Sequence, residues 1–376
     1  MMLDYELLKL IWWCLIGVLL IGFAIADGMD MGTGILLPVV GRSDAERRSA
    51  INTIAPHWDG NQVWLITAGG AIFAAWPVVY AIAFSSFYFA MLLVLLALFF
   101  RPVGFDYRSK IESTRWRASW DWLIWFGSLV PALVFGVAFG NLLQGVPLEV
   151  DGLMRASYAG SFFGLLNPFA LLCGLVSVLM LSIQGGVWLM ARADERVAMR
   201  ARRIVLGAGP LLLVLYLLAG VWMIASGMGY RLAAIGDVSG AMRLLDKQVV
   251  GAAWLDGVGI HAWLAPMLGM VMILATWFLA WGSRSGLVLV TSSLSVAAVI
   301  ASAGVAMFPF LMPSSLQPEA SLTLWDATSS QLTLSVMFWV ALVMTPVILA
   351  YTSWCYVKMW RRVRVAEIER DAHALY

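Results

Sequence analysis

The residues best suited to chemistry stand where the chain turns apolar. His57, Trp58 and Asp59 follow one another directly, and most residues from there to Pro77 are apolar or small. An ionisable cluster at the mouth of a membrane helix is costly to desolvate, which favours a functional role. A structural role is equally open for Asp59 alone, because Asp is a favoured N-cap residue and tryptophan is common at membrane interfaces.

The elements that must position these residues are membrane helices. Of the 376 residues, 62% are hydrophobic and 12% are charged, about half the charged fraction of a soluble domain. The net charge of +2 does not suggest nucleic acid as a partner. The three cysteines lie in apolar runs without CxxC spacing, which indicates neither a disulfide framework nor a zinc site.

Nine windows have the length of about 20 apolar residues that a bilayer crossing requires. They predict an all-α integral membrane protein with a single membrane domain over residues 1–376, because no stretch between windows is long enough for a soluble domain. If the second and third windows form one bent element around Pro77, the number is eight. The windows lie near residues 8–27 (with continuation to 40), 61–80, 83–101, 121–144, 160–191, 203–226, 257–281, 286–311 and 331–357.

The basic residues orient these helices. When the connecting segments are assigned alternately to the two sides, 19 of the 24 Lys and Arg residues fall on one side. Because cytoplasmic loops carry the excess of Lys and Arg, we predict that the N-terminus is outside and the C-terminus is cytoplasmic.

This orientation brings the intramembrane charges to one depth. A first helix that rises 1.5 Å per residue from the outside carries Asp27 and Asp30 to its inner end, on one face. His57 and Asp59 open the next helix at that surface, and Arg101 closes the third helix there. We therefore expect three helices to bring their ionisable groups together near the cytoplasm.

Two explanations of this cluster are compatible. Chains of Asp, His and water conduct protons into membrane proteins, which favours a proton path. Alternatively, Arg101 neutralises Asp27 or Asp30 and holds helices together. A further structural alternative is that the cluster is merely interfacial and solvated, with Gly28, Gly32 and Gly34 as small residues that allow close helix packing and not as a phosphate loop.

On the outer side, Asp326 precedes the last long window. Asp326, Thr328 and Ser329 are residue types that satisfy the free amides at a helix start, so we expect them to cap this helix.

The histidines limit a redox role for this chain. His57 lies at the inner surface, His261 near the outer start of the seventh helix, and His373 in the tail. Because no two share a depth within the bilayer, we expect no haem held between two histidines of this chain.

Three stretches carry a resemblance to a known family. In chain order they are GFAIADGMDMG (Gly22–Gly32), IAPHWDGNQVWLITAGGAIFAAWPVVYA (Ile54–Ala81) with FFRPVGFDYRSK (Phe99–Lys110), and the segment from AGVAMFPFLMPSS to SLTLWDATSSQLTL (Ala303–Leu334). Together they resemble subunit II of the cytochrome bd-type quinol oxidases, and the resemblance extends over essentially the whole chain.

The resemblance implies a bacterial inner-membrane heterodimer. Its subunit I carries haem b558, haem b595 and haem d, and the complex oxidises quinol (ubiquinol or menaquinol), reduces O₂ to water and takes protons from the cytoplasm. Small single-helix subunits are compatible with it. The implied fold is two four-helix bundles plus a peripheral helix, with the first bundle in about 1–144 and the other helices in about 160–376.

The family's motifs also assign roles to residues of this chain. The resemblance implies that Asp59 lies on a proton path along the interface with subunit I, and that Trp58 holds a quinone. Asp27, Asp30 and Arg101 match the family's polar cluster, and we expect His57, Asp27 and Asp30 to set the field around Asp59.

Two other function classes stay open. A secondary transporter would show broken helices at the midplane and an inverted repeat, and the sequence shows neither. A purely structural partner of a haem subunit would conduct nothing, and substitution of Asp59 distinguishes it from an active subunit.

Overall fold

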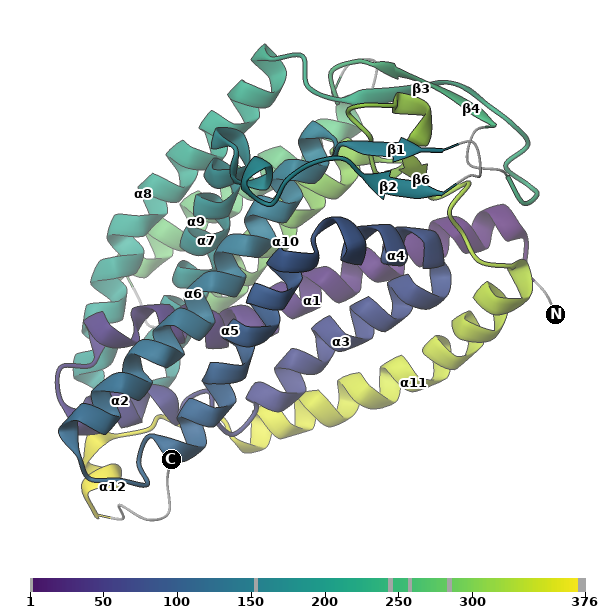
Figure 1. The fold of residues 1–376 in the computed structure, drawn as a ribbon. Coiled ribbons are helices and arrows are strands. Elements are labelled where there is room, and N and C mark those ends of the chain that lie inside the picture. The colour runs from purple at the N-terminus through teal and green to yellow at the C-terminus, as the bar shows by residue number, and fades with distance from the viewer. Residues whose placement is uncertain (1–2, 152–154, 243–245, 256–258, 283–285, 371–376) are drawn as a thin grey trace.

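The structure is a computed structural model that describes residues 3–151, 155–242, 246–255, 259–282 and 286–370. Long helices run between two ends of the molecule, and small sheets cover one of these ends (Figure 1). His373 lies outside the described residues. In chain order the helices are α1 (Tyr5–Val40), α2 (Asp44–Ile51), α3 (Trp58–Ala75), α4 (Pro77–Ser86), α5 (Tyr88–Tyr107), α6 (Thr114–Gln144), α7 (Pro168–Arg192), α8 (Glu195–Ala225), α9 (Leu264–Gly282), α10 (Gly286–Met307), α11 (Gln331–Lys358) and α12 (Val365–Arg370).

Within the described residues, three antiparallel hairpins and three short 3₁₀ helices connect the long helices. Backbone amides and carbonyls outside the helices find partners in these pairings, as buried connections require. The strand pairs are β1 (Leu148–Val150) with β2 (Ala156–Tyr158), β3 (Tyr230–Ile235) with β4 (Lys247–Gly251), and β5 (Phe310–Met312) with β6 (Leu322–Thr323). The 3₁₀ helices are η1 (Phe163–Leu166), η2 (Ile260–Trp263) and η3 (Pro318–Ala320).

The all-α membrane fold is confirmed. Eight helices of the described chain are long and apolar enough to cross a bilayer, namely α1, α5, α6, α7, α8, α10, α11 and the segment Ile260–Gly282. Helix α3 has 18 residues but a polar first turn, so the ninth span stays a prediction.

The predicted boundary between the second and third spans is wrong. Helix α3 ends at Ala75, and Pro77 begins α4, a separate helix of 10 residues. Proline favours the first position of a helix and restricts the residue before it, so the chain turns at Trp76. The next long helix, α5, then runs from Tyr88 to Tyr107.

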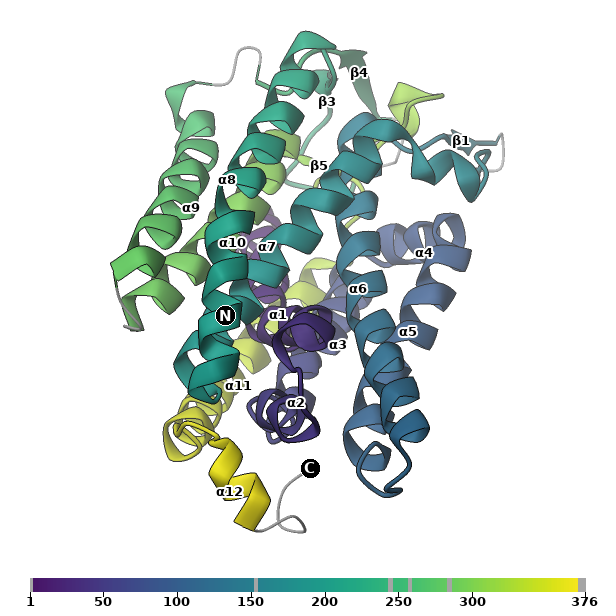
Figure 2. The same cartoon turned by 90° about the vertical axis from the view of Figure 1, so that its left-hand side faces the viewer.

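Helix α1 forms the centre of the molecule. It packs against α3, α6, α7 and α10, and Figure 2 shows it between α7–α10 on one side and α3–α6 on the other. At Gly32 the backbones of α1 and α7 approach so closely that a Cβ would collide with the Leu181 carbonyl and with Gly185. Close packing is therefore the role of Gly32, as we expected.

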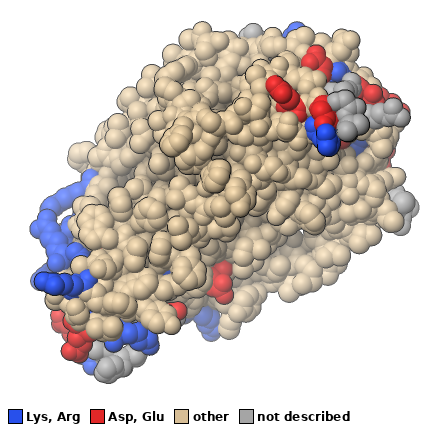
Figure 3. Space-filling model, in the orientation of Figure 1, with Lys and Arg blue, Asp and Glu red and all other residues tan. Residues whose placement is uncertain are grey.

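The two ends of the molecule differ in charge. Residues of both charges gather at the two ends, and Lys and Arg are more prominent at the end where α2 and α12 lie (Figure 3). The flank between the two ends carries few charges in Figure 3, so it can lie against lipid or against a partner subunit. Helix α11 is the least covered span, with 11% of its apolar window buried.

Candidate functional site

A fully buried ion pair lies on α1 and α5. Asp27, Asp30 and Arg101 are each 0% exposed, and Arg101 Nη2 donates to Asp27 Oδ1 over 2.6 Å. Asp30 lies one helical turn from Asp27 on the same face. The structure thus brings together the two acids and the arginine that the sequence placed at one depth.

Half of the carboxylate oxygens in this cluster accept no hydrogen bond from the described residues, although the carboxyl groups of Asp27 and Asp30 interact with each other. Asp27 Oδ2 and Asp30 Oδ1 accept no hydrogen bond from the described residues, and neither Nε nor Nη1 of Arg101 donates one. Buried polar atoms are normally paired, so unpaired ones mark functional sites, water or ions.

Asn61 and Tyr356 complete the cluster. Asn61 Nδ2 donates to Asp30 Oδ2 over 3.0 Å, and the Tyr356 hydroxyl donates to Asn61 Oδ1 over 2.6 Å. Asn61 is 1% exposed. Tyr356 lies 295 positions away from Asn61 in the chain, so residue spacing did not predict its contact with the cluster. The only signal was a tyrosine close to the inner end of an otherwise apolar helix.

His57 forms the floor of the cluster. It precedes α3 without capping it, its ring stacks on Tyr356 with centroids 4.9 Å apart, and it meets Trp188 edge-on at 5.4 Å. Its Nε2 has no partner among the described residues. Burial, followed by the positive charge of Arg192, lowers the pKa of His57 to about 4. The imidazole is therefore neutral at neutral pH.

Asp59 points away from the buried cluster. It is exposed in the first turn of α3, whereas Asn61 is buried. The N-cap position of α3 belongs to His57, so Asp59 is not the cap. The cluster therefore consists of Asp27, Asp30, His57 and Arg101, and Asp59 lies on the outside of the chain where a partner could reach it.

Trp58 lies beside Phe105, and a separate apolar cavity lies toward the outer side. The Trp58 and Phe105 rings are 6.5 Å apart. The cavity has a volume of about 350 Å³, and α1, α3, α6, α7, α8 and α10 all contribute to its walls. Phe23 and Leu65 line it, but Trp58 does not.

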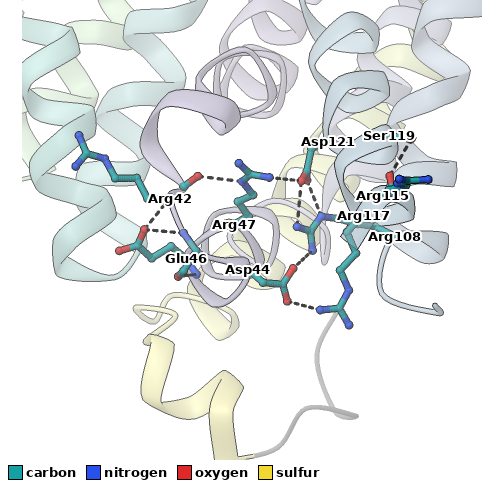
Figure 4. A network of polar contacts seen from close by, with 11 residues as sticks. Arg42, Asp44, Glu46, Arg47, Arg108, Arg115, Arg117, Ser119 and Asp121 are labelled. Carbon is teal, nitrogen blue, oxygen red and sulfur yellow. Dashed lines mark hydrogen bonds and ion pairs between the residues drawn. The ribbon is translucent and has the colours of Figure 1, made fainter. Parts of the chain in front are cut away.

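A second group of charges forms an ionic network on the ends of α2, α5, α6 and α8 that lie opposite the hairpins, on the side that we predict to be cytoplasmic. Figure 4 shows its centre, where Asp121 accepts from Arg47 and Arg108, each over 2.6 Å. Asp44 pairs with Arg108 at 3.0 Å and with Arg117 at 2.9 Å. All four of these carboxylate oxygens therefore have a partner.

Glu46 anchors the other side of this network. Its two oxygens accept from Arg200 over 2.6 and 3.1 Å, and Oε2 also accepts from the amides of Arg42 and Ser43. These hydrogen bonds, with the one from Arg200 foremost, lower the pKa of Glu46 to about 2. We call Asp44, Glu46 and Asp121 with their arginines the cytoplasmic network.

The segment after α11 folds back across the same end of the molecule. Arg192 Nη2 donates to the Met359 carbonyl over 2.5 Å, and Nε donates to the Arg361 carbonyl over 2.7 Å. The Arg192 guanidinium lies between the rings of Trp188 and Trp360, 4.8 and 5.0 Å from their centroids. This segment thus lies directly below His57, which contacts Trp188.

At the outer end, Asp326 does not cap α11. The cap is Ser330, whose Oγ accepts from the Thr333 amide. Asp326 instead accepts from the amide and hydroxyl of Thr323 and pairs with Lys247 at 2.5 Å. The turn at Thr323 draws Asp326 away from the helix start, which corrects the capping role expected for it.

The described residues offer no metal centre. They contain no group of three or more His, Cys, Asp or Glu side chains that could hold a metal ion. His57 precedes α3 at the inner end, and His261 lies in η2 at the opposite end of the helices.

Comparisons with known proteins agree with the sequence resemblance. Residues 8–359 match the family model for cytochrome bd terminal oxidase subunit II. The chain is 57% identical to cytochrome bd-I ubiquinol oxidase subunit 2 of Escherichia coli, over the full length of both chains. It is 30% identical to cytochrome bd ubiquinol oxidase subunit 2 of Bacillus subtilis, over 94% of this chain and 96% of that one.

A solved structure shares the fold. The bd oxidase from Geobacillus thermodenitrificans contains a chain that superposes with a TM-score of 0.63, at 15% identity, over 94% of this chain and 99% of the other.

Proposed function

Because this chain belongs to the family of cytochrome bd terminal oxidase subunit II, we propose that its inner acids serve proton uptake by the oxidase. The chain is a multi-pass subunit of a bacterial inner-membrane quinol oxidase. The observation that supports the proposal is the buried cluster of Asp27, Asp30 and Arg101, in which half of the carboxylate oxygens are unpaired.

The haems belong to the partner. The family name implies a haem-bearing complex with a subunit I. We assign haem b558, haem b595 and haem d to that subunit, since His57 and His261 lie at opposite ends of the described helices. The haems supply the electron transfer and O₂ chemistry, and this chain supplies protons and support.

The proton path uses two groups of acids in this proposal. Reduction of O₂ to water consumes protons, and taking them from the cytoplasm builds a gradient when quinol releases its protons outside. Asp59 stands exposed at the inner end of α3, where the surface of subunit I would cover it. Asp27 and Asp30 lie behind it inside the chain and form a second store of exchangeable protons.

A quinone fits the apolar cavity through its prenyl chain. The walls are almost entirely apolar side chains, as such sites require, and Phe23 and Leu65 are among them. Leu65 is seven residues from Trp58 on α3, about 10 Å along the helix axis. We therefore propose that the prenyl chain of the quinone lies in the cavity and that its ring lies toward Trp58. It requires that Leu65→Trp and Trp58→Ala both lower the quinone content of the purified complex.

Asp59→Asn tests proton uptake in the complete oxidase. The amide keeps the shape of the side chain and removes the titrating group, so the complex should assemble with normal haem spectra and lose most quinol-driven oxygen consumption. Glu112→Gln, on an exposed loop, is the matched control and should keep the wild-type rate. Wild-type oxygen consumption by Asp59→Asn across neutral pH would rule out Asp59 as a proton carrier and leave it a structural role.

A further inference from the structure

The carboxyl groups of Asp27 and Asp30 interact directly, and each has one oxygen with no other partner. The two acids lie three residues apart on one face of α1, and both are 0% exposed. Asp27 Oδ2 and Asp30 Oδ1 accept no hydrogen bond from the described residues, while the two carboxyl groups are close enough for a hydrogen bond to each other. Such a bond requires a proton, because an ionised carboxylate can only accept.

The charge of the cluster also requires one proton. Two ionised carboxylates beside the buried guanidinium of Arg101 would leave one uncompensated negative charge, which is costly away from water. Two carboxylates in contact cannot both ionise without strong repulsion, and one proton between them removes it. With one proton, the pair and Arg101 together are neutral.

The groups beyond Asn61 do not supply the missing positive charge. His57 Nδ1 lies 3.4 Å from Asn61 Nδ2, but burial and the charge of Arg192 lower the pKa of His57 to about 4, so its ring is neutral at neutral pH. Arg192 acts on Tyr356, which contacts the other end of the Asn61 amide. The charge balance is therefore set by the two acids and Arg101.

The partners of the remaining two oxygens decide which acid carries the proton. Asp27 Oδ1 accepts from Arg101 Nη2 over 2.6 Å, and such an ion pair favours the ionised carboxylate. Asp30 Oδ2 accepts from the neutral amide of Asn61 over 3.0 Å, a bond that the carbonyl oxygen of a protonated acid also accepts. The proton therefore belongs on Asp30 Oδ1, which donates it to Asp27 Oδ2.

We propose that Asp27 and Asp30 hold one shared proton at rest, with Asp27 as the charged member and Asp30 as the neutral member that donates to it. The inference deepens the proposed function and rests on it: the store of exchangeable protons in this chain holds one proton, and Arg101 sets that number. Delivery of the proton leaves two negative charges facing Arg101, so the pair must take up another proton before it can deliver again.

Infrared spectra of the assembled oxidase test the number of protons, because the C=O band of a protonated carboxyl group lies apart from the bands of carboxylates. With isotope-labelled aspartate, the wild type should show a protonated band at neutral pH that Asp30→Asn removes. Asp27→Asn should remove the same band, since Asp30 then ionises to compensate Arg101. Asp106→Asn, an exposed position on α5, is the matched control and should leave the band unchanged.

Other spectra would contradict the shared proton. A band that persists in Asp27→Asn would show that Asp30 is neutral without its neighbour. Identical spectra of the wild type and Asp30→Asn would show two ionised aspartates, bridged by water or by a metal cation. Wild-type oxygen consumption by Asp30→Asn would instead overturn the role of the pair in proton uptake, and the band would still decide whether the proton is shared.

Unfolding temperatures provide a second readout. Each single Asn variant keeps one carboxylate for Arg101, so both should assemble and unfold near the wild-type temperature. The double variant Asp27→Asn/Asp30→Asn leaves Arg101 buried without a counter-charge, and it should fail to assemble or unfold at a much lower temperature. A single variant that fails to assemble, a raised unfolding temperature in Asp30→Asn, or a double variant as stable as the wild type would each overturn the proposal.

Discussion

Two groups of charged residues at the inner end of this chain differ in how completely they are paired. In the cytoplasmic network, both oxygens of Asp44, Glu46 and Asp121 face a guanidinium or an amide. In the buried cluster, Asp27 and Asp30 each have one paired and one unpaired oxygen.

The difference indicates that the cytoplasmic network stabilises the fold, whereas the buried cluster can take part in proton exchange. A carboxylate whose lone pairs are all occupied by arginine has little freedom to exchange a proton, and it holds elements together. A buried carboxylate with an open oxygen has kept a position for a proton or a water molecule. We therefore expect substitutions in the network to change stability, and substitutions in the cluster to change turnover.

The largest expected effect comes from removing Arg101. Breaking one partner of a buried pair leaves the other charge uncompensated, which costs about 3–5 kcal/mol. Arg101→Leu should therefore prevent assembly or sharply lower the unfolding temperature of the complex. The double variant Asp27→Leu/Arg101→Leu should assemble again but stay inactive. Full activity in the double variant would show that the pair is only structural.

The next prediction separates the two groups directly. Asp30→Asn should leave the unfolding temperature unchanged and lower oxygen consumption more than tenfold. The substitution removes the carboxyl group that exchanges a proton, but it breaks no ion pair. Asp121→Asn should do the reverse: its hydrogen bonds to charged groups are worth about 1.5–3 kcal/mol each, and the assembled enzyme should keep its rate. If the two substitutions changed the unfolding temperature and the rate of oxygen consumption in the same way, the network and the buried cluster would not differ in role.

Acid should act on the two groups in different pH windows. The pKa of His57 is lowered from 6.5 to about 4, so its burial becomes unfavourable as the pH falls from about 6.5 towards 4. The pKa of Glu46 is lowered from 4.5 to about 2, so its stabilising effect is present above pH 4.5 and is lost between about 4.5 and 2. In the wild-type complex, the unfolding temperature should therefore fall in two steps as the pH is lowered, one between about 6.5 and 4 and one between about 4.5 and 2. His57→Gln should remove the first of these steps, and Glu46→Gln should remove the second.

The smallest expected effect lies at the outer end, away from both groups. Ser330 caps α11 through its hydroxyl, and replacing a cap by Ala costs about 1 kcal/mol. Ser330→Ala should lower the unfolding temperature slightly and leave oxygen consumption and its pH profile unchanged. A changed profile would mean that the outer start of α11 is coupled to the inner cluster.

The sequence predicted the helical membrane fold and the meeting of Asp27, Asp30, His57 and Arg101, because hydrophobic length and helix rise fix depth. It did not separate Asp59 from them. Residues two apart on a helix do not face each other, so that spacing already placed Asp59 and Asn61 on different sides.

Two other features depend on tertiary structure and were beyond sequence reasoning. Tyr356 reaches Asn61 only because α11 packs beside α3. Asp326 and Ser330 are both suitable caps by residue type, and the turn at Thr323 decides between them. In each case a contact across the fold selects among residues that are locally equivalent.

Arg192 holds the returning C-terminal segment through the carbonyls of Met359 and Arg361. Every amino acid carries a backbone carbonyl, so the side chains at these two positions are free to vary between homologues without weakening the hydrogen bonds. Covariation with Arg192 is therefore not expected at either position. Selection acts instead on the length of the segment, since one inserted or deleted residue would displace both carbonyls from the guanidinium.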